Sequence, residues 1–252
     1  MAGAPVVSPS LVLGTLRYGE TSRIVRLATR DAGVQSAIAK GADRPRSRFG
    51  AALQLLSEGH AHLIPSRSSD LHLLTAFDLS RLHHGLARGI ERFAAASALA
   101  EVAGRFIPTS PMPELFDALV DDVALLEAVD EDAVGVVALR ALWGLVGHLG
   151  LTPILDACAR DGAPLATGGA VFSVADGGLL CSRCARPPHS ALVDEGDRAA
   201  LKAFTTGTGE LPILSERHAA AHRRLYGRWV RHHLTDAPLP ALDFWQRRDT
   251  SG

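Results

Sequence analysis

The amino-acid sequence predicts an α+β protein in which a small β-barrel precedes a helical region. Five short strand-like runs lie within about the first 80 residues, which favours a closed or partly open barrel. The β pattern ends near Asp78, where helical periodicity begins. All three cysteines lie in one Gly-rich segment, residues 156–190, which we expect to form a separate small element.

Composition bounds the class of protein. The chain has 252 residues, of which 47% are hydrophobic and 21% charged, so it can bury a substantial core. These values exclude a mostly disordered, collagen-like or coiled-coil chain. A formal net charge of −1 excludes a globally basic nucleic-acid coat and leaves room for local basic patches.

The cysteine count and the apolar pattern bear on the compartment. Three cysteines are too few, and odd in number, for a disulfide framework, so we expect a reducing cytoplasm. The N-terminus lacks the basic and apolar regions of a signal peptide. The most apolar stretch, residues 133–151, is interrupted by Arg140 and His148, so we expect no membrane span.

The predicted barrel strands alternate with turn signals. Strands are expected at residues 11–16, 22–29, 34–39, 51–64 and 71–77. The fourth is expected to be longer or bent, and residues 1–10 a loose leader. In the second, Val25 and Leu27 share one face. A hairpin-type turn at Asp31-Ala32-Gly33 and a polar, Arg-rich loop at 41–50 separate strands two to four.

Helical periodicity covers most of the chain after the barrel. Helices are expected at residues 79–106, 114–129, 132–149, 194–204 and 214–234. Residues 108–113, which contain three prolines, break the first from the second, and the tail 235–252 is expected to be ordered only in part. Segment 114–132 carries eight acidic residues and no Lys or Arg. A solvated face explains it most simply, and a protein-binding face is the alternative.

A basic stretch between Arg17 and Gly50 is the first candidate site. It holds eight basic and three acidic residues, a local charge of +5. Forked guanidinium donors spread along an extended loop suit phosphates, and small barrels often bind single strands. Few aromatic residues are nearby, so binding should depend on the DNA backbone, with weak sequence preference. A solvated loop is the alternative. The candidate DNA contacts are Arg23, Arg26, Lys40, Arg44, Arg46 and Arg48.

The cysteines form the second candidate site. Cys181 and Cys184 have the Cys-x2-Cys spacing of a zinc knuckle, and Cys158 lies upstream in position for the other half. Asp161 stands where a full pair would have its second Cys, and a carboxylate can bind zinc. The predicted ligands of a structural Zn²⁺ are therefore Cys158, Asp161, Cys181 and Cys184, with His189 as a spare. The alternative is a degenerate knuckle with packed or free thiols.

The last predicted helix is strongly basic. Arg217, Arg224 and Arg228 share one face with Arg231 and are further candidate DNA contacts. A solvated face opposite Leu225, Trp229 and Leu234 explains the pattern equally well. His218 and His222 are spaced i, i+4, but Ala219 replaces the Glu of a metalloprotease helix, so we expect no metal there.

Motifs of turnover enzymes do not occur in the sequence. It has no G-x4-G-K-[ST] loop, no G-x-S-x-G elbow and no dinucleotide fingerprint. No Glu lies beside the cysteines to act as a general base for a zinc hydrolase. We therefore expect a binding protein that uses no nucleotide cofactor, rather than an enzyme.

Several runs occur in an order that matches a known family. They are Tyr18-Gly19-Glu20-Thr21-Ser22-Arg23-Ile24-Val25, Lys40-Gly41-Ala42, Arg44-Pro45-Arg46-Ser47-Arg48-Phe49, Leu53-Gln54, Leu149-Gly150-Leu151-Thr152-Pro153 and the cysteine segment with Phe172 and Gly177-Gly178. Together they resemble the RecO family of bacterial recombination mediators, over roughly residues 10–235. Asp161 departs from the family pattern, which has a second Cys there. The resemblance implies an OB-type barrel at 1–80, a helical domain at 81–155 and 191–240, and a zinc-knuckle insert at 156–190.

The resemblance also implies a function. Proteins of this family bind single- and double-stranded DNA, anneal complementary strands, and with RecR help RecA load onto strands coated by single-stranded-DNA-binding protein (SSB), without nucleotide hydrolysis. They work in the cytoplasm, at the nucleoid. The acidic, apolar-ended SSB C-terminal tail docks on the helical domain, for which Arg92, Arg105 and Arg140 are candidate contacts. The alternative is a protein-interaction adaptor with only incidental DNA binding.

Overall fold

The structure is a computed structural model that describes residues 4–165, 169–185, 191–207 and 210–247. The chain divides into two compact units, residues 1–134 and 135–252, and each is considered by itself. Among the residues described, none of the helices has the length and apolar run that a membrane crossing requires. The predicted residue limits of the three domains stay a prediction.

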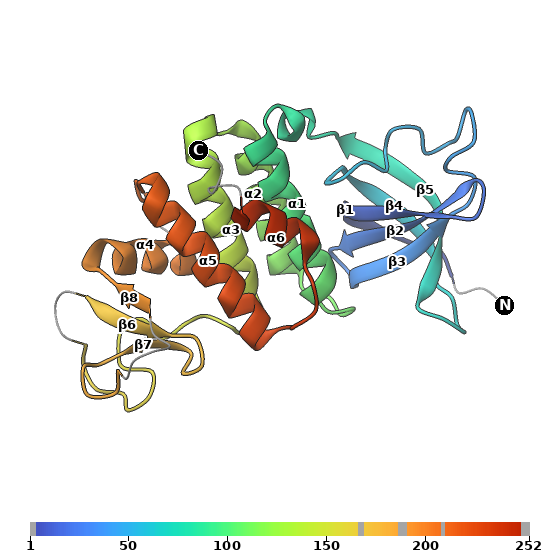
Figure 1. Ribbon diagram of the computed structural model, residues 1–252. Coiled ribbons are helices and arrows are strands. Elements are labelled where there is room, and N and C mark those ends of the chain that lie inside the picture. Colours follow the sequence, from blue (N-terminus) through green and yellow to red (C-terminus); the bar gives the residue numbers. More distant parts are fainter. Residues whose placement is uncertain (1–3, 166–168, 186–190, 208–209, 248–252) are drawn as a thin grey trace. The chain divides into compact units, whose positions relative to one another are not determined.

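The first unit begins with a closed five-stranded barrel (Figure 1). Its strands are β1 (Val6–Tyr18), β2 (Ser22–Thr29), β3 (Gly33–Ala39), β4 (Glu58–Ile64) and β5 (Leu71–Arg81). The strand order is β1-β2-β3-β5-β4, and β4 pairs with β1 to close the barrel. All pairs are antiparallel except β3 with β5. The predicted OB-type barrel is confirmed.

The barrel core comes from the strands and from the connection between β3 and β4. Val25 and Leu27 are fully buried, as the alternation in β2 predicts. Phe49 and Leu53 of the connection also belong to this core. The prediction of one strand over 51–64 is therefore wrong in its first half. Residues 51–56 form turns, because their apolar side chains fill the barrel while Leu56 N–H bonds to the carbonyl of Val12 at 2.6 Å.

Two strand limits also differ from expectation. The leader is not loose from residue 6 onward, since Val6 to Leu11 pair with β4. Strand β5 continues to Arg81, because Leu79 and Arg81 pair with Gly59 and Glu58. The helix expected from residue 79 therefore begins at Ile90. Long-range pairing orders the leader and overrides the helical periodicity at residues 79–81.

The rest of the first unit is helical. It comprises the 3-10 turn η1 (His84–Ala87), α1 (Ile90–Phe106), α2 (Pro113–Ala128) and the 3-10 turn η2 (Glu131–Ala133). Gly33, which begins β3, has a φ of +68°, and a Cβ there would meet the carbonyl oxygens of Pro108 and Ser110. Val34 N–H bonds to that Pro108 oxygen at 2.9 Å. The turn between β2 and β3 therefore seats the α1–α2 connection against the barrel.

The second unit packs helices around aromatic side chains. Its elements are α3 (Val134–His148), β6 (Ala170–Ser173), β7 (Gly178–Leu180), β8 (Ala191–Val193), α4 (Glu195–Thr206), α5 (Glu216–His233) and α6 (Pro240–Arg247). Trp143 of α3 meets Tyr226 of α5 edge-on, with ring centroids 5.2 Å apart. Phe172 of β6 meets Trp229 of α5 at 5.7 Å, which attaches the small sheet to that helix.

The C-terminal tail contains an ordered helix that the sequence pattern did not predict. Leu242 and Trp245 of α6 are fully buried. A Cβ at Gly227 would meet the side-chain amide of Gln246, so the glycine leaves room for that amide against α5. The guanidinium of Arg223 lies 5.3 Å from the Trp245 ring centre. Because α6 has only eight residues, it is too short to show clear helical periodicity in the sequence.

Candidate metal centre and candidate nucleic-acid surfaces

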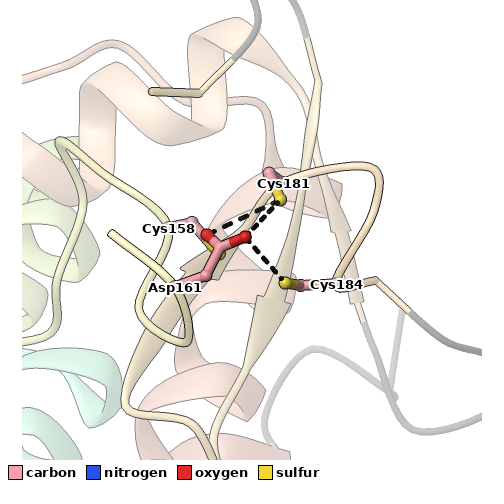
Figure 2. A group of neighbouring side chains, drawn as sticks. All are labelled: Cys158, Asp161, Cys181 and Cys184. Carbon is pink, nitrogen blue, oxygen red and sulfur yellow. Dashed lines mark hydrogen bonds between the residues drawn. The ribbon is translucent and has the colours of Figure 1, made fainter. Parts of the chain in front are cut away.

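Cys158, Asp161, Cys181 and Cys184, called here the knuckle cluster, come together in the second unit (Figure 2). Each offers one ligand atom, and these atoms all lie within 4.8 Å of one another. Cys158 and Asp161 belong to the loop after α3, and Cys181 and Cys184 to the turn after β7. The four predicted ligands are thus brought together and can hold a metal ion. The spare candidate His189 lies outside the described residues.

Local backbone bonds set the positions of both pairs. The carbonyl of Cys158 accepts the N–H of Gly162 at 2.8 Å, which closes the first turn. In the second turn the carbonyl of Cys181 accepts the N–H of Cys184 at 3.0 Å. A bond of 2.7 Å from Ala159 N–H to the carbonyl of Leu179 ties the two halves together. The Cys-x2-Cys and Cys-x2-Asp spacings therefore produce two facing turns.

The cluster has the dimensions of a zinc site. Zn–S bonds of about 2.3 Å and Zn–O bonds of about 2.0–2.2 Å place tetrahedral ligand atoms about 3.5–3.8 Å apart. The Cys181 Sγ lies 3.8 Å and the Cys184 Sγ 3.3 Å from Asp161 Oδ2. These two distances lie close to the tetrahedral values. Asp161 therefore fits as the fourth ligand in place of a cysteine.

Proton affinities within the cluster differ between its members. Hydrogen bonds from the Cys158 thiol, the Ala163 N–H and the Cys184 thiol lower the pKa of Asp161 to about 2. Desolvation and the Asp161 carboxylate raise the pKa of Cys184 to about 12. The pKa of Cys181 is lowered, chiefly by the backbone N–H of Cys184. Asp161 is thus ionised at neutral pH, and a bound dication would displace the Cys184 proton.

Charged neighbours brace the knuckle cluster. Arg160 donates two hydrogen bonds of 2.8 Å to the carboxylate of Asp176 and a third of 2.8 Å to the carbonyl of Cys184. Asp176 also accepts a bond from Ser173 at the end of β6. The fork of Arg160 therefore holds the second ligand turn against the small sheet. Arg183 lies 3.4 Å from Asp161, where its charge favours the carboxylate form.

The basic loop, residues 40–50, is an exposed surface on a fixed base. Lys40, Arg44, Arg46 and Arg48 are all exposed. Phe49 anchors the loop in the barrel core, and the Arg48 guanidinium lies 5.1 Å from its ring centre. Successive turn bonds, such as Ser47 N–H to Arg44 carbonyl at 3.0 Å, shape the rest. The loop therefore presents four exposed cations to solvent, one of which, Arg48, stacks on the ring that anchors the loop.

Two of the barrel's predicted DNA contacts hold the fold together instead of facing solvent freely. Arg23 Nε donates to Asp43 at 2.6 Å, within the base of the basic loop. Arg26 donates to Ser36 at 2.7 Å and to the carbonyl of Gly104 at 3.1 Å, joining the barrel to α1. Burial lowers the pKa of Arg26. Their role in DNA binding stays a prediction, and these contacts give each a structural role.

The predicted arginine face of α5 is exposed. Arg217, Arg224 and Arg228 are all open to solvent, while Leu225 and Trp229 on the opposite face are buried. Arg231, on the same face, pairs with Asp243 of α6. Ser215 caps the helix by accepting the N–H of His218. The helix therefore combines a core face with a row of three cations, as its spacing indicates.

One predicted candidate contact for an acidic tail is used inside the fold. Arg92 is buried and donates to the carbonyls of Glu127 and Val129 at 2.7 and 2.8 Å. It also bonds to Glu131 at 3.1 Å, so it caps the C-terminus of α2. This role depends on two helices meeting, which periodicity alone does not reveal. Arg105 is exposed and Arg140 is half-buried.

A pocket of about 250 Å³ lies between β8, α4 and α5. Its lining is Leu192, Val193, Asp197, Ala221, His222, Arg224, Leu225 and Arg228. Leu192 is one of the most exposed large apolar residues among those described, at 77%. Apolar side chains and two arginines thus meet at one hollow. Sequence reasoning missed it, since β8 and the middle of α5 are about thirty residues apart in the chain.

Comparisons with known proteins cover nearly the whole chain. The family model described as "Recombination protein O N terminal" matches residues 4–83, and "Recombination protein O C terminal" matches residues 87–243. The "DNA repair protein RecO" of Anaeromyxobacter dehalogenans strain 2CP-C is 37% identical over 231 residues, 89% of each chain. The protein of that name from Rubrobacter xylanophilus is 35% identical over 222 residues, 86% of this chain and 85% of its own.

Proposed function

This chain belongs to the RecO family of DNA repair proteins, and from that membership we propose that it acts as a recombination mediator. In this role it binds single- and double-stranded DNA and anneals complementary strands. Together with RecR it helps RecA load onto SSB-coated single strands in the cytoplasm, at the nucleoid. It does so as a binding protein that turns over no substrate and hydrolyses no nucleotide.

The exposed cations of the basic loop carry this proposal. Lys40, Arg44, Arg46 and Arg48 extend from an OB-like barrel, an architecture that suits single strands lying across its surface. Annealing requires two polyanions to approach each other, which neutralised phosphates permit. The arginine face of α5 supplies a second cationic surface, so each strand has a place to bind.

The pocket beside α5 is the best candidate for the SSB tail. An acidic segment that ends in apolar residues requires an apolar hollow with cations at its rim. Leu192 and Leu225 supply the first, and Arg224 and Arg228 the second. We propose that the tail docks here, instead of at Arg92, whose guanidinium is already committed to α2.

We propose Zn²⁺ as the ion of the knuckle cluster. Three thiolates and one carboxylate form a closed tetrahedral set that favours zinc over harder cations. Cys158 and Cys181 are buried, and no Glu or His among the described residues completes an open catalytic site with them. The ion would therefore serve to fold the segment around it.

The first experiment is annealing of two complementary oligonucleotides that are coated with SSB, with no nucleotide added. Acceleration over the protein-free control is expected. The triple variant Arg44→Ala, Arg46→Ala, Arg48→Ala should lose most of it, while Arg88→Ala, an exposed arginine just before α1, serves as the matched control. No acceleration by a folded wild-type chain would contradict the mediator role.

The salt dependence of single-strand binding tests the electrostatic mechanism. If about five phosphates are neutralised, log K should fall against log[salt] with a slope near −3.5. Each arginine removed from the basic loop should reduce the slope by about 0.7 and weaken binding for all sequences alike. A flat response would contradict the electrostatic mechanism, and an unchanged slope in the triple variant would place the DNA site elsewhere.

A protein-interaction adaptor is the second candidate function. The observation that favours it is the set of exposed carboxylates on α2 and the residues that follow it, among them Glu114, Asp121, Asp130 and Asp132. Dissociation constants for DNA weaker than about 100 μM at physiological salt, only the non-specific level, would favour it. Retention of RecR or SSB under the same conditions would then identify the adaptor as the main role.

A further inference from the structure

A second group of metal-ligating side chains lies where α4 begins beside α5. Asp194, Asp197 and His218 each direct one ligand atom into a space in which these atoms lie within 4.8 Å of one another. His222 reaches the same carboxylate from one turn further along α5. We propose that Asp194, Asp197 and His218 form a second divalent-metal site, distinct from the knuckle cluster, and that His222 is its positioning residue.

The two helices build the group in complementary ways. Asp194 is the N-cap of α4, and its Oδ1 accepts the N–H of Asp197 at 2.8 Å. Its Oδ2 takes no part in this capping bond and can serve as the ligand atom. His218 and His222 are four residues apart, so both rings lie on the same face of α5. The two carboxylates come from the N-cap and the first turn of α4. The histidine spacing alone therefore predicted no metal here.

The geometry around Asp197 shows how the side chains converge. His218 Nδ1 lies 3.0 Å and His222 Nε2 3.1 Å from the same oxygen, Asp197 Oδ1. Zinc bonds of about 2.0–2.2 Å to nitrogen and oxygen place neighbouring ligand atoms about 3.3–3.5 Å apart. The His218–Asp197 pair needs to open by only a few tenths of an ångström to admit an ion. Asp194 and His218 are accessible enough for rotation to complete the set.

The chemical class of ion follows from the donors. One imidazole and two carboxylates suit borderline divalent ions such as Zn²⁺ and Co²⁺, with water at the remaining positions. A site of this kind lacks thiolates, so it should bind more weakly than the knuckle cluster. Asp197 and His222 also line the pocket of about 250 Å³, which gives water a route to the ion.

His222 holds Asp197 in place rather than binding the ion itself. Its side chain is 3% exposed and its ring meets Phe204 edge-on, with centroids 5.4 Å apart. A carboxylate only accepts hydrogen bonds, so the neutral ring donates from Nε2 to Asp197. Partners of this kind orient a ligating carboxylate, and their loss typically weakens metal binding about 10–100-fold.

Cobalt binding to the full-length chain tests the proposal. The metal-free protein is titrated with Co²⁺, while calorimetry and metal analysis give the stoichiometry and absorbance reports thiolate-to-cobalt charge transfer. We expect two ions per chain, of which only the tighter one produces charge-transfer bands. The variant His218→Ala should lose the weaker ion and retain the bands. His232→Ala, another exposed histidine of α5, should retain both.

Two outcomes would overturn the proposal. One is a single ion per wild-type chain that accounts for all the charge transfer. The other is a second ion that remains bound in His218→Ala. For the positioning role, His222→Ala should weaken the second ion about 10–100-fold, while His222→Gln, which keeps an N–H donor, should recover affinity. Equal affinity for the second ion in the wild type, His222→Ala and His222→Gln would overturn that role. No readout involves DNA, so the result is independent of the proposed role in binding and annealing DNA.

Discussion

The barrel and the knuckle segment, residues 154–185, are held together by different forces. Fully buried side chains such as Val12, Leu27 and Leu74 line a barrel whose five strands close on one another. The knuckle segment has strands of only three and four residues, and its own apolar cluster contains two of the cysteines. Apolar burial accounts for the order of the barrel, whereas we expect the knuckle segment to depend on a metal cross-link among the members of the knuckle cluster.

Removal of the metal should produce the largest difference in order between the knuckle segment and the barrel. Chelation, or the variant Cys181→Ser, should abolish hydrogen-exchange protection over residues 154–185 and leave the strands of the barrel protected. Ser182→Ala, in the same turn but not a ligand, is the matched control. Hydrogen exchange followed by mass spectrometry measures both regions at once. Full protection without metal would show that packing alone orders the knuckle segment.

A cavity in the barrel core should destabilise the barrel and leave the knuckle segment unaffected. Leu27→Ala removes a fully buried side chain from β2 and should lower the free energy of unfolding of the first unit by about 2–5 kcal/mol. The loss should be the same with and without chelator. Leu16→Ala, at a 68% exposed site of β1, should change stability by less than about 0.5 kcal/mol. Denaturant titration checks both, and equal losses would refute this account of the core.

The hydrogen bonds of the buried Arg92 should contribute to the stability of the first unit. Arg92→Met keeps most of the volume but leaves the carbonyls of Glu127 and Val129 without their donor. We expect a loss of about 2–4 kcal/mol in the free energy of unfolding. The exposed Arg88, four residues earlier, provides the control Arg88→Met. A stable Arg92→Met with intact α2 would mean that water replaces the guanidinium.

The identity of residue 161 should have the smallest and most specific effect. The pKa of Asp161 is held at about 2, so its carboxylate binds metal at neutral pH without losing a proton. A cysteine must release one proton to bind. In Asp161→Cys, the log K for zinc should therefore fall by about one additional unit for each unit that the pH falls. Chelator competition between about pH 6 and about pH 8 measures it. Asp161→Asn, of the same shape without charge, should bind more weakly, and unchanged slopes would exclude residue 161 as a ligand.

Local patterns predicted much of the fold and of the knuckle cluster. Strand β2 has the predicted limits, and the hairpin turn before β3 lies where Gly33 indicates. The Cys-x2-Cys spacing and Asp161 identified all four members of the cluster. These predictions succeed because each depends on neighbours within a few residues. The exposed state of the basic loop and of the α5 arginines followed from charge and periodicity in the same way.

Contacts between distant segments account for what sequence reasoning missed. The apolar run at 51–56 fills the barrel instead of extending β4, and α6 forms because Trp245 has a place to be buried. Arg26 and Arg92 look like surface cations until Gly104 and the end of α2 are placed beside them. The same is true of the pocket at Leu192 and of the carboxylates that face His218.

The sequence by itself determined the family, the order of barrel and helices, and the four members of the knuckle cluster, since periodicity and short spacings carry that information. Only the tertiary structure decided which arginines are available to a phosphate and which are consumed inside the fold. It also decided that two aspartates at the start of α4, Asp194 at its N-cap and Asp197 in its first turn, meet two histidines of α5. Such pairings depend on helix packing, which brings together residues about twenty positions apart in the chain. Burial of apolar faces drives that packing, and the apolar pattern does not predict which polar side chains then become neighbours.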